Sequence, residues 1–566
     1  MNIFQSLIIK KVTGAYPALK ELVGAALFEN PKNPEFGDTA LPCFRFSSVL
    51  KKSPAAVAEE LRNLFEEDDS FESVTNINGY LNFKYRKERY IEYVCGSFEK
   101  NTLFNDIKSY GGGKTVVIDY SHPNVAKNMG IHNLRSTIIG QSIYNIHEFL
   151  GFKAVGVNHL GDWGTQFGKL MWALEEWSSY EEVENKGILF LNEIYVRFHN
   201  EAEIKPELEE KAREWFKKLE DNDEPALKWW KLFIKVSMDA YNDIYRRLNI
   251  KFDHITGESF YIKFLDDTVN RLDERGLTEF SEGALVVKFD DSENMPPCLL
   301  KKSDGATLYA TRDIAAAMYR LIEFKPNRVL YVTDVAQELH FAQVFKVMEM
   351  YDPTNKDIFR HIKFGRLSFP NVQMSTRKGN IVPLSEVLDR ARDKVLDIIE
   401  ERNADIPDKL QTADKIGIGA VIFNDLSVSR IKNIEFDWDK TLSFEGETGP
   451  HVQYSYVRIM NILEKTGSFD TIADLSLIKD EFSYDLIKLL EQFEPKVKQA
   501  CEEYEPSVIA NYLIELSKSF NRFYQNNRVV GEEVKTMQSR AYLINILGTV
   551  YGKCMDLLGI PKIDKM

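Results

Sequence analysis

The sequence has few cysteines and no closely spaced pair of them. The five cysteines among 566 residues are Cys43, Cys95, Cys298, Cys501 and Cys554. Their scatter and odd number argue against a disulfide framework, and the lack of a Cys-x-x-Cys spacing argues against a structural zinc site. Scattered free thiols fit a reducing compartment, so we expect a cytoplasmic protein.

Long apolar runs and an excess of positive charge are also missing. No segment is apolar for long enough to span a bilayer. The first residues lack the basic start and the cleavage site of a signal peptide, so we expect no membrane association. The net charge of −14 is weak evidence against a nucleic-acid partner. Because nucleic acids bind to local patches, the total charge does not decide the question.

The length predicts several domains, since 566 residues exceed what one hydrophobic core usually holds. The sequence shows neither an internal repeat nor a low-complexity segment. The first hundred residues combine a helical pattern with a strand-like run at Gly79–Phe83, and they end before the glycine-rich joint Gly111–Gly113. A domain boundary is expected there.

The next segment has the pattern of a βαβ unit. The β-branched run Thr115–Ile118 predicts a buried parallel strand, and apolar residues from Leu134 to Leu150 recur at helical spacing up to Gly151. Ala154–Val157 predicts the next strand. A similar pattern from Arg328 predicts the second half of one open sheet, whose ligands would lie at the carboxyl ends of the strands.

Two other regions have a helical pattern. Residues 170–250, approximately, predict a helical insertion, whose charges are more typical of a solvated helix face than of a binding patch. From about residue 450 onward the pattern predicts a separate helical bundle. The predicted fold class is therefore α/β: a Rossmann-type parallel-sheet domain with a helical insertion, a small α+β N-terminal domain and a C-terminal all-α bundle.

The segment Asp119–Lys127 and the segment Gly130–Thr137 lead from the end of a strand through a loop into a helix. Backbone N–H groups and the helix dipole make such a place suitable for binding phosphate. Taken alone, the same segment also fits an ordinary strand-to-helix turn with polar caps.

These segments resemble the signature of class I arginyl-tRNA synthetases, Ser-x-Pro-Asn-x-Ala-Lys followed by His-x-Gly-His-Leu-Arg-Ser-Thr. Further family-like segments follow in order at residues 158–168, 309–313, 337–341, 374–380, 449–454 and 556–560. The resemblance covers essentially the whole chain. It implies ATP-dependent activation of L-arginine to arginyl-adenylate, followed by transfer to the 3′ end of tRNA(Arg).

The resemblance also implies a domain for each part of the chain. The expected order is an N-terminal domain that contacts the tRNA elbow (1–106), the catalytic domain (107–380), a connecting helical region with the second signature loop (381–449) and an anticodon-binding domain (450–566).

One departure from the family motivates an alternative. The four positions that read His-x-Gly-His in the family are Gly130-Ile131-His132-Asn133 here. The alternative is a catalytically impaired, tRNA-binding paralogue. A second alternative is a synthetase for another amino acid, such as cysteine. The pair Asp119 and Asp313 and the lack of a zinc-ligand cluster weigh against it.

A guanidinium presents five donors in a flat fork and keeps its charge, so its site needs carboxylates and neutral acceptors around one plane. The resemblance implies six arginine-binding residues: Asp119, Ser121, Asn124, Tyr309, Asp313 and Gln337. Ser121 and Asn124 would hold the α-amino and carboxylate groups. Without the family context, Tyr309 and Asp313 also fit a capped helix start.

The expected catalysis consists of positioning and charge neutralisation, without a covalent enzyme intermediate. The catalytic residues implied are Lys127, His132, Asn133, Arg377 and Lys378. The ATP-binding residues implied are Gly130, Ile131, His132, Asn133, His159, Gly161, Asp162, Met374 and Ser375. We expect Mg²⁺ to be carried on ATP and no metal to be held by the protein.

The expected partners are tRNA(Arg), L-arginine and ATP, and we expect a monomer. The tRNA-binding residues implied are Gln453, Tyr454 and Arg458. An aromatic ring and a cation are suited to stacking on exposed bases. Tyr454 also fits simple packing between helices.

Overall fold

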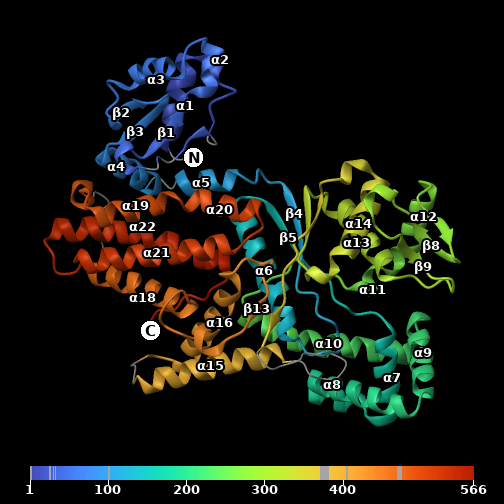
Figure 1. Cartoon of the computed structure of the whole chain (residues 1–566). Coiled ribbons are helices and arrows are strands. Elements are labelled where there is room, and N and C mark those ends of the chain that lie inside the picture. The colour runs from blue at the N-terminus through green and yellow to red at the C-terminus, as the bar shows by residue number, and fades with distance from the viewer. Residues whose placement is uncertain are drawn as a thin grey trace. The chain divides into compact units, whose positions relative to one another are not determined.

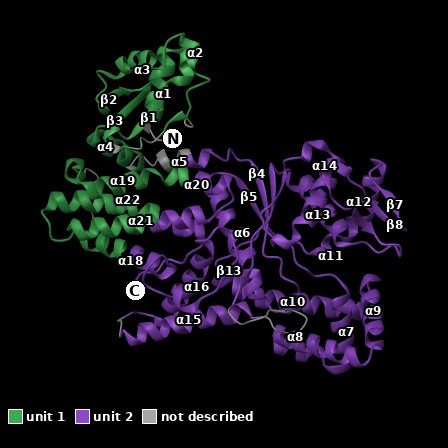
Figure 2. Cartoon of the chain, viewed as in Figure 1, with its two compact units in different colours: residues 1–106, 458–496, 515–551 green, residues 107–457, 497–514, 552–566 purple. Residues whose placement is uncertain are grey.

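The structure is a computed structural model. The chain forms two compact units (Figure 2). It describes residues 3–24, 27–29, 31, 33–99, 102–369, 382–402, 406–467 and 474–565. Unit 1 comprises residues 1–106, 458–496 and 515–551, and unit 2 comprises residues 107–457, 497–514 and 552–566. Within the described ranges, no helix combines the length and apolarity needed to cross a membrane.

Unit 1 contains a three-stranded antiparallel sheet in the order β1-β3-β2. The strands are β1 (Thr39–Pro42), β2 (Phe71–Ile77) and β3 (Tyr80–Tyr85). β2 and β3 form a hairpin, and its turn residues Asn78 and Gly79 both have positive φ, as a type I′ turn requires. The strand-like run predicted from Gly79 is therefore β3, and it begins one residue later because Gly79 belongs to the turn.

The helices at the two ends of the chain supply the rest of unit 1, and some of them extend into unit 2. The N-terminal helices are α1 (Ile3–Ala15), α2 (Ser47–Leu50), α3 (Pro54–Arg62), α4 (Lys87–Glu99) and α5 (Thr102–Ser109). The C-terminal helices are α18 (Gly449–Thr466), α19 (Glu481–Glu491), α20 (Phe493–Glu502), α21 (Ser507–Asn526) and α22 (Val534–Leu558). The helical pattern predicted after residue 450 is confirmed, and its segments are divided between the two units.

Unit 2 is built on a parallel sheet of five strands in the order β11-β10-β4-β5-β6. Figure 1 labels two of these strands, β4 and β5. The strands are β4 (Thr115–Asp119), β5 (Lys153–Asn158), β6 (His254–Ile255), β10 (Arg328–Tyr331) and β11 (Phe359–His361). The chain leaves β4 toward β5 on one side and later returns to β10 on the other side. The topology therefore switches between β4 and β10, where sheets of this type bind ligands.

The two faces of this sheet carry different helices. Val117, Val155 and Val329 pack on one face in a common core with α13 and α14. Tyr120 points to the other face, against Gly140 of α6, where an added Cβ would lie 2.3 Å from the Tyr120 Cβ. Alternation along each strand thus decides which side chains face α13.

The remaining elements of unit 2 are mainly helices. Those around the sheet are α6 (Ile131–Phe149), α11 (Glu258–Tyr261), α12 (Leu265–Glu274), α13 (Tyr309–Phe324), α14 (Glu338–Tyr351), α15 (Leu384–Glu401), α16 (Lys409–Leu426) and α17 (Trp438–Thr441). The predicted insertion is α7 (Thr165–Trp177), α8 (Tyr180–Ile204), α9 (Glu207–Glu220) and α10 (Glu224–Arg247). The smaller sheets are β7 (Glu279–Ser281), β8 (Ala284–Val287) and β9 (Cys298–Lys301), and β12 (Leu367–Ser368) with β13 (Ile434–Glu435).

The predicted fold class is confirmed, including the βαβ unit formed by β4, α6 and β5. The small antiparallel sheet β7-β8-β9 was not predicted. Its strands have three or four residues, which is too short for a clear alternating pattern.

Candidate active site

Three polar residues meet at the carboxyl edge of the sheet because they share one face. Asp119 ends β4, His159 follows β5 and Tyr331 ends β10, with Asp119 opposite both Val157 and Tyr331 in the register. Side chains two positions apart on a strand point to the same face. Asp119, His159 and Tyr331 therefore share a face with Val117, Val157 and Val329, whose side chains pack in the core with α13. The sequence therefore directs all three toward the same helix.

Arg320 of α13 occupies the space between them. Its Nη1 lies 2.7 Å from Asp119 Oδ2, and the side chains of Arg320 and Asp119 are 1% and 4% exposed. Burial alone would raise the pKa of Asp119. The positive charge of Arg320 and the contact with His122 outweigh burial, so the pKa of Asp119 lies well below its usual range. The charge of Asp119 is thus already balanced by an internal guanidinium, which the sequence did not predict.

His159 completes this group as a neutral ring. It stacks on Tyr261 with ring centroids 5.4 Å apart, and its Nδ1 lies 3.4 Å from Arg320 Nη2. Burial lowers the pKa of His159 to about 4, with Asp119 opposing the shift and Arg320 adding to it. At neutral pH the ring offers shape and hydrogen bonding rather than charge.

The loop after β4 has an unusual backbone conformation. Ser121, His122 and Ala126 have positive φ although none is glycine, a costly arrangement that clusters at functional sites. The Ser121 hydroxyl contacts the Tyr245 and Thr137 hydroxyls, each at 2.9 Å, and the side chain is buried. The Ser121 hydroxyl therefore helps to hold the loop in this conformation, and its role in binding the α-amino and carboxylate end of arginine stays a prediction.

His122 connects this loop to Asp119. Its Nε2 lies 2.8 Å from Asp119 Oδ1, and its Nδ1 lies 3.4 Å from Ser136 Oγ. No role for His122 was predicted from the sequence.

Asn124 and Gly161 lie against each other at the ends of the loops after β4 and β5. Val125 N–H donates to the Gly161 carbonyl at 3.0 Å. An added Cβ on Gly161 would come within 2.2 Å of Asn124 Oδ1, so a larger residue there would displace the Asn124 side chain. Asn124 is exposed and remains available to a substrate.

The neighbouring Asp162 has an architectural role instead. It is buried, and its carboxylate accepts hydrogen bonds from the Ser259 N–H at 2.8 Å and the Ser259 hydroxyl at 2.6 Å. Burial raises the pKa of Asp162. Asp162 therefore holds the start of α11 rather than presenting its carboxylate to a ligand.

The start of α6 offers fewer backbone donors than expected. Asn133 Oδ1 accepts from the Gly130 N–H at 3.1 Å, Ile131 N–H donates to the Val382 carbonyl at 3.0 Å, and Asn133 N–H donates to the Gly130 carbonyl at 2.9 Å. The distant residue Val382 thus satisfies the N–H group of Ile131, and the Asn133 side chain satisfies that of Gly130. Side chains thus become the main candidates for contact with phosphate.

His132 and Lys127 are two such side chains. His132 keeps contact with solvent, while desolvation and the Lys127 ammonium lower the pKa of His132. The Lys127 ammonium lies 5.0 Å from the centroid of the Tyr195 ring.

The second signature loop falls where the chain is not described. Met374, Ser375, Arg377 and Lys378 lie outside the described residues. The description resumes at Val382, and the Leu384 N–H donates to the Met129 carbonyl at 2.8 Å. The segment that follows this loop is therefore hydrogen-bonded to the start of α6.

The first turn of α13 brings an aromatic ring, a cation and a buried acid together. Tyr309 is 61% exposed, and the Arg312 guanidinium lies 4.6 Å from its ring centroid. Arg312 Nε also lies 3.4 Å from Glu258 Oε2. Burial raises the pKa of Glu258 to about 7; Arg312 opposes the shift, and Asp313 and Asp162 add to it.

Glu258→Gln should change the pH dependence of stability. Because folding raises the pKa of Glu258 from 4.5 to about 7, stability present below the unfolded pKa is lost as the pH rises toward 7. The variant avoids this loss, so its advantage should grow by up to about 3 kcal/mol between pH 4.5 and pH 8. Loss of the Arg312 contact adds a pH-independent offset. Urea denaturation across this range measures both, and a difference that stays constant with pH would contradict the prediction.

Asp313 and Gln337 lie on neighbouring helical segments. Asp313 Oδ2 lies 2.6 Å from His340 Nε2, and both side chains are about three-quarters buried. Asp313, Ala317 and Arg320 share one helical face, so Asp313 lies about 10 Å along the axis from Arg320. Gln337 precedes α14 and is exposed.

The three predicted tRNA contacts differ in accessibility. Gln453 is fully buried, and its Nε2 donates to the Lys415 carbonyl at 3.0 Å and the Pro561 carbonyl at 2.9 Å. The prediction that Gln453 contacts tRNA was therefore wrong. Tyr454 is 39% exposed. In unit 1, Arg458 Nη1 lies 3.3 Å from Asn521 Oδ1.

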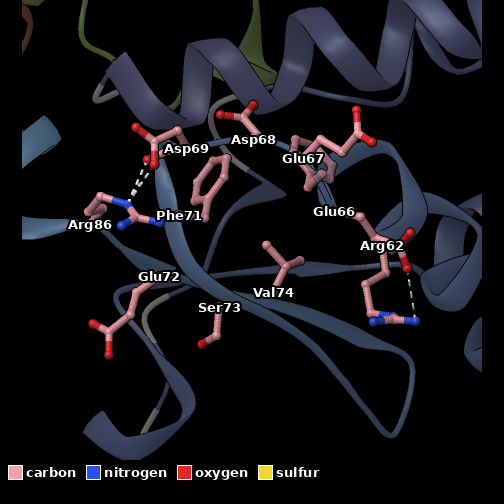
Figure 3. Close-up of a pocket in the computed structure, with 11 residues that line it drawn as sticks. Arg62, Glu66, Glu67, Asp68, Asp69, Phe71, Glu72, Ser73, Val74 and Arg86 are labelled. Atoms are coloured by element: carbon pink, nitrogen blue, oxygen red, sulfur yellow. Dashed lines mark hydrogen bonds and ion pairs between the residues drawn. The ribbon is translucent and has the colours of Figure 1, made fainter.

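A pocket in unit 1 has none of the predicted site residues in its lining (Figure 3). Arg62, Phe65, Glu66, Glu67, Asp68, Asp69, Phe71, Glu72, Ser73, Val74 and Arg86 line it. Its two arginines form ion pairs with Glu66 and Asp69, at 3.5 and 3.1 Å. The remaining acids would repel a phosphate, so this pocket is not a candidate for nucleotide binding.

Family models match three parts of the chain. Residues 2–85 match the arginyl tRNA synthetase N-terminal domain, residues 100–438 match the catalytic domain of class I tRNA synthetases (R), and residues 452–566 match the DALR anticodon binding domain. The catalytic-domain model alone covers more than half of the chain.

Curated relatives and solved structures agree with these matches. The chain is 42% identical to the arginine–tRNA ligase of Halothermothrix orenii over 541 residues and 43% identical to that of Alkaliphilus metalliredigens over 543, covering 95% of each chain in both cases. The arginyl-tRNA synthetase structure from Plasmodium falciparum is 26% identical at a TM-score of 0.77, with 100% and 98% coverage. The Thermus thermophilus structure shares the fold at 24% identity and a TM-score of 0.82, with both chains fully covered. The impaired paralogue finds no support among these relatives.

Proposed function

The chain belongs to the class I arginyl-tRNA synthetase family, and from this premise we propose how its own residues attach arginine to tRNA. In the family reaction, the arginine carboxylate attacks the α-phosphate of ATP, and pyrophosphate leaves. The terminal ribose hydroxyl of the tRNA then takes the arginyl group, and AMP leaves. The observation that carries the proposal is the convergence of Asp119, His159 and Asp313 at the carboxyl edge of a parallel sheet, from which the chain leads into the start of α6.

In our proposal, Asp313 supplies the uncompensated negative charge for the substrate guanidinium. Asp119 already pairs with Arg320 at 2.7 Å, so it orients neighbouring groups and adds little net charge. Tyr309 and Gln337 are exposed near the start of their helices and complete the arginine site. Asn124 binds the α-amino and carboxylate end, while Ser121 holds the loop in place.

ATP lies over the start of α6 in this proposal. His132 and the side-chain amide nitrogen of Asn133 contact phosphate oxygens, and Lys127 with Arg377 and Lys378 neutralises the developing charge. Mg²⁺ enters bound to the triphosphate of ATP. Among the described residues, no group of three or more His, Cys, Asp or Glu side chains is placed to hold a metal ion.

The tRNA contacts involve both ends of the chain. In unit 1, Phe44 is 46% exposed and packs edge to face on Tyr80 at 5.1 Å, next to the exposed Arg45. An exposed ring beside a cation suits a splayed base, which supports the N-terminal domain as the contact for the tRNA elbow. Tyr454 and Arg458 are the proposed anticodon-side contacts. The domain boundaries, the monomeric state and the cytoplasmic location remain predictions.

A panel of amino acids in the aminoacylation reaction tests the proposed function. We expect tRNA(Arg) to be charged with arginine and not with citrulline, which has the same shape but no charge. Pyrophosphate exchange with arginine, ATP and the tRNA should lie well above background. A preference for any other amino acid, or an absence of exchange, would contradict the proposal.

His132→Ala and Asn133→Ala test the loop at the start of α6. Each removes one donor near the phosphates, so we expect the rate of pyrophosphate exchange to fall on the order of tenfold or more. The KM for arginine should change little, because neither side chain faces the guanidinium. Thermal unfolding serves as the folding control. Unchanged exchange in both variants would exclude these side chains from phosphate binding.

A further inference from the structure

Asp313 and His340 link two helices beside the proposed arginine site. Asp313 lies in the second turn of α13, and His340 lies in the first turn of α14. The His340 Nε2 and Asp313 Oδ2 atoms are 2.6 Å apart, and the side chains are 28% and 25% exposed. The pair is therefore well fixed but open on one side.

The hydrogen bond from His340 occupies one oxygen of the Asp313 carboxylate and leaves the other available. In the ranges that the structure describes, Asp313 Oδ1 accepts no hydrogen bond, and no lysine or arginine forms an ion pair with Asp313. Asp119 differs, because Arg320 lies 2.7 Å from its carboxylate. Asp313 is thus the acid at this edge that still lacks a strong cation.

The other groups that face Asp313 do not supply a positive charge at neutral pH. Burial lowers the pKa of His159 to about 4 and raises the pKa of Cys298 to about 12. Burial also raises the pKa of Tyr331, so its hydroxyl stays neutral. Glu258 is itself an acid. A cation entering from solvent would therefore be attracted to Asp313.

We propose that His340 is a positioning residue of the arginine site, which fixes the carboxylate plane of Asp313 through its Nε2–H donor. The terminal torsion of an aspartate is broad, while a guanidinium binds best to oxygens in its own plane. With Oδ2 held by His340, Oδ1 faces the substrate in one orientation. This inference rests on the proposed role of Asp313 in binding arginine.

The test compares His340→Ala, His340→Gln and His340→Asn in aminoacylation by the full chain, at saturating ATP and tRNA. The alanine variant should raise the KM for arginine on the order of tenfold, as expected for a lost hydrogen bond to a charged group. Its kcat and its KM for ATP should change much less. Glutamine should restore a near-normal KM because its amide nitrogen reaches about as far as Nε2. Asparagine, which is shorter, should not.

A double-mutant cycle with Asp313→Asn tests separately the role of His340 and the role of Asp313 in binding arginine. If His340 acts through Asp313, the double variant His340→Ala/Asp313→Asn should have the same KM for arginine as Asp313→Asn alone. Full additivity, an unchanged KM in His340→Ala, or failure of glutamine to rescue would overturn the role of His340. An unchanged KM in Asp313→Asn alone would instead overturn the proposed role of Asp313.

A structural control lies one turn further along α14. Gln343 Nε2 donates to the Pro296 carbonyl at 2.8 Å, so Gln343→Ala also removes a tie between α14 and a neighbouring segment. We expect this variant to keep the normal KM for arginine. A rise equal to that of His340→Ala would show that any loosening of α14 has the same effect, and would overturn the proposal.

Discussion

Asp313→Asn should lower kcat/KM for arginine by a factor that corresponds to about 2 to 5 kcal/mol of lost transition-state stabilisation. This is the usual cost of removing one partner of a buried charge pair. The loss should appear mainly in the KM for arginine. The physical reason is that Asp313 is the acid at this edge with no arginine or lysine paired to it in the described ranges, whereas Asn offers a single neutral acceptor. Steady-state aminoacylation with varied arginine measures the effect.

The control for this prediction removes the same charge from the same helix. Glu323 is exposed near the end of α13, about 15 Å from Asp313 by helix geometry. Glu323→Gln should leave arginine use unchanged. A normal KM for arginine in Asp313→Asn, or equal impairment of both variants, would contradict the role of Asp313.

Arg320→Met should destabilise the protein by about 3 to 5 kcal/mol, because it leaves the Asp119 carboxylate buried without its counter-ion. Arg320 and Asp119 are 1% and 4% exposed, so solvent cannot replace the lost partner. Methionine is chosen because it fills most of the same space. Urea denaturation should show an earlier transition for the variant.

The double variant Asp119→Asn/Arg320→Met identifies the cause of this loss. Replacing the carboxylate with a neutral amide removes the stranded charge, so the double variant should regain a large part of the stability. No recovery would mean that Arg320 stabilises the fold through packing rather than through its charge. A wild-type transition for Arg320→Met would contradict the buried pair itself.

The sequence was sufficient for the strands β4, β5 and β10, for α6 and for the helical insertion, whereas the short strands β6 and β11 were not predicted. The runs Thr115–Ile118 and Ala154–Val157 identified β4 and β5, because strands buried on both faces consist largely of apolar and β-branched residues. The loop between β4 and α6 was found through its motif. The placement of Asp119 at the end of a strand was likewise expected, since parallel strands end at one edge.

Contacts between distant segments could not be predicted. Arg320 lies in a helix, where an arginine normally faces solvent, and its pairing with Asp119 depends on how α13 packs on the sheet. The Ile131 N–H bonds to Val382, far along the sequence. Gln453 is buried because Gly419 leaves room for its amide beside the Pro561 carbonyl. No local pattern reports such contacts.

The arginine-bound structure tests the central claim most directly. The distance to measure is that between the substrate guanidinium nitrogens and the carboxylate oxygens of Asp313. We expect one nitrogen within hydrogen-bonding distance of Oδ1, with Oδ2 still held by His340 and Asp119 still paired with Arg320. A guanidinium that binds elsewhere, or that displaces Arg320 from Asp119 and leaves Asp313 without contact, would contradict the account.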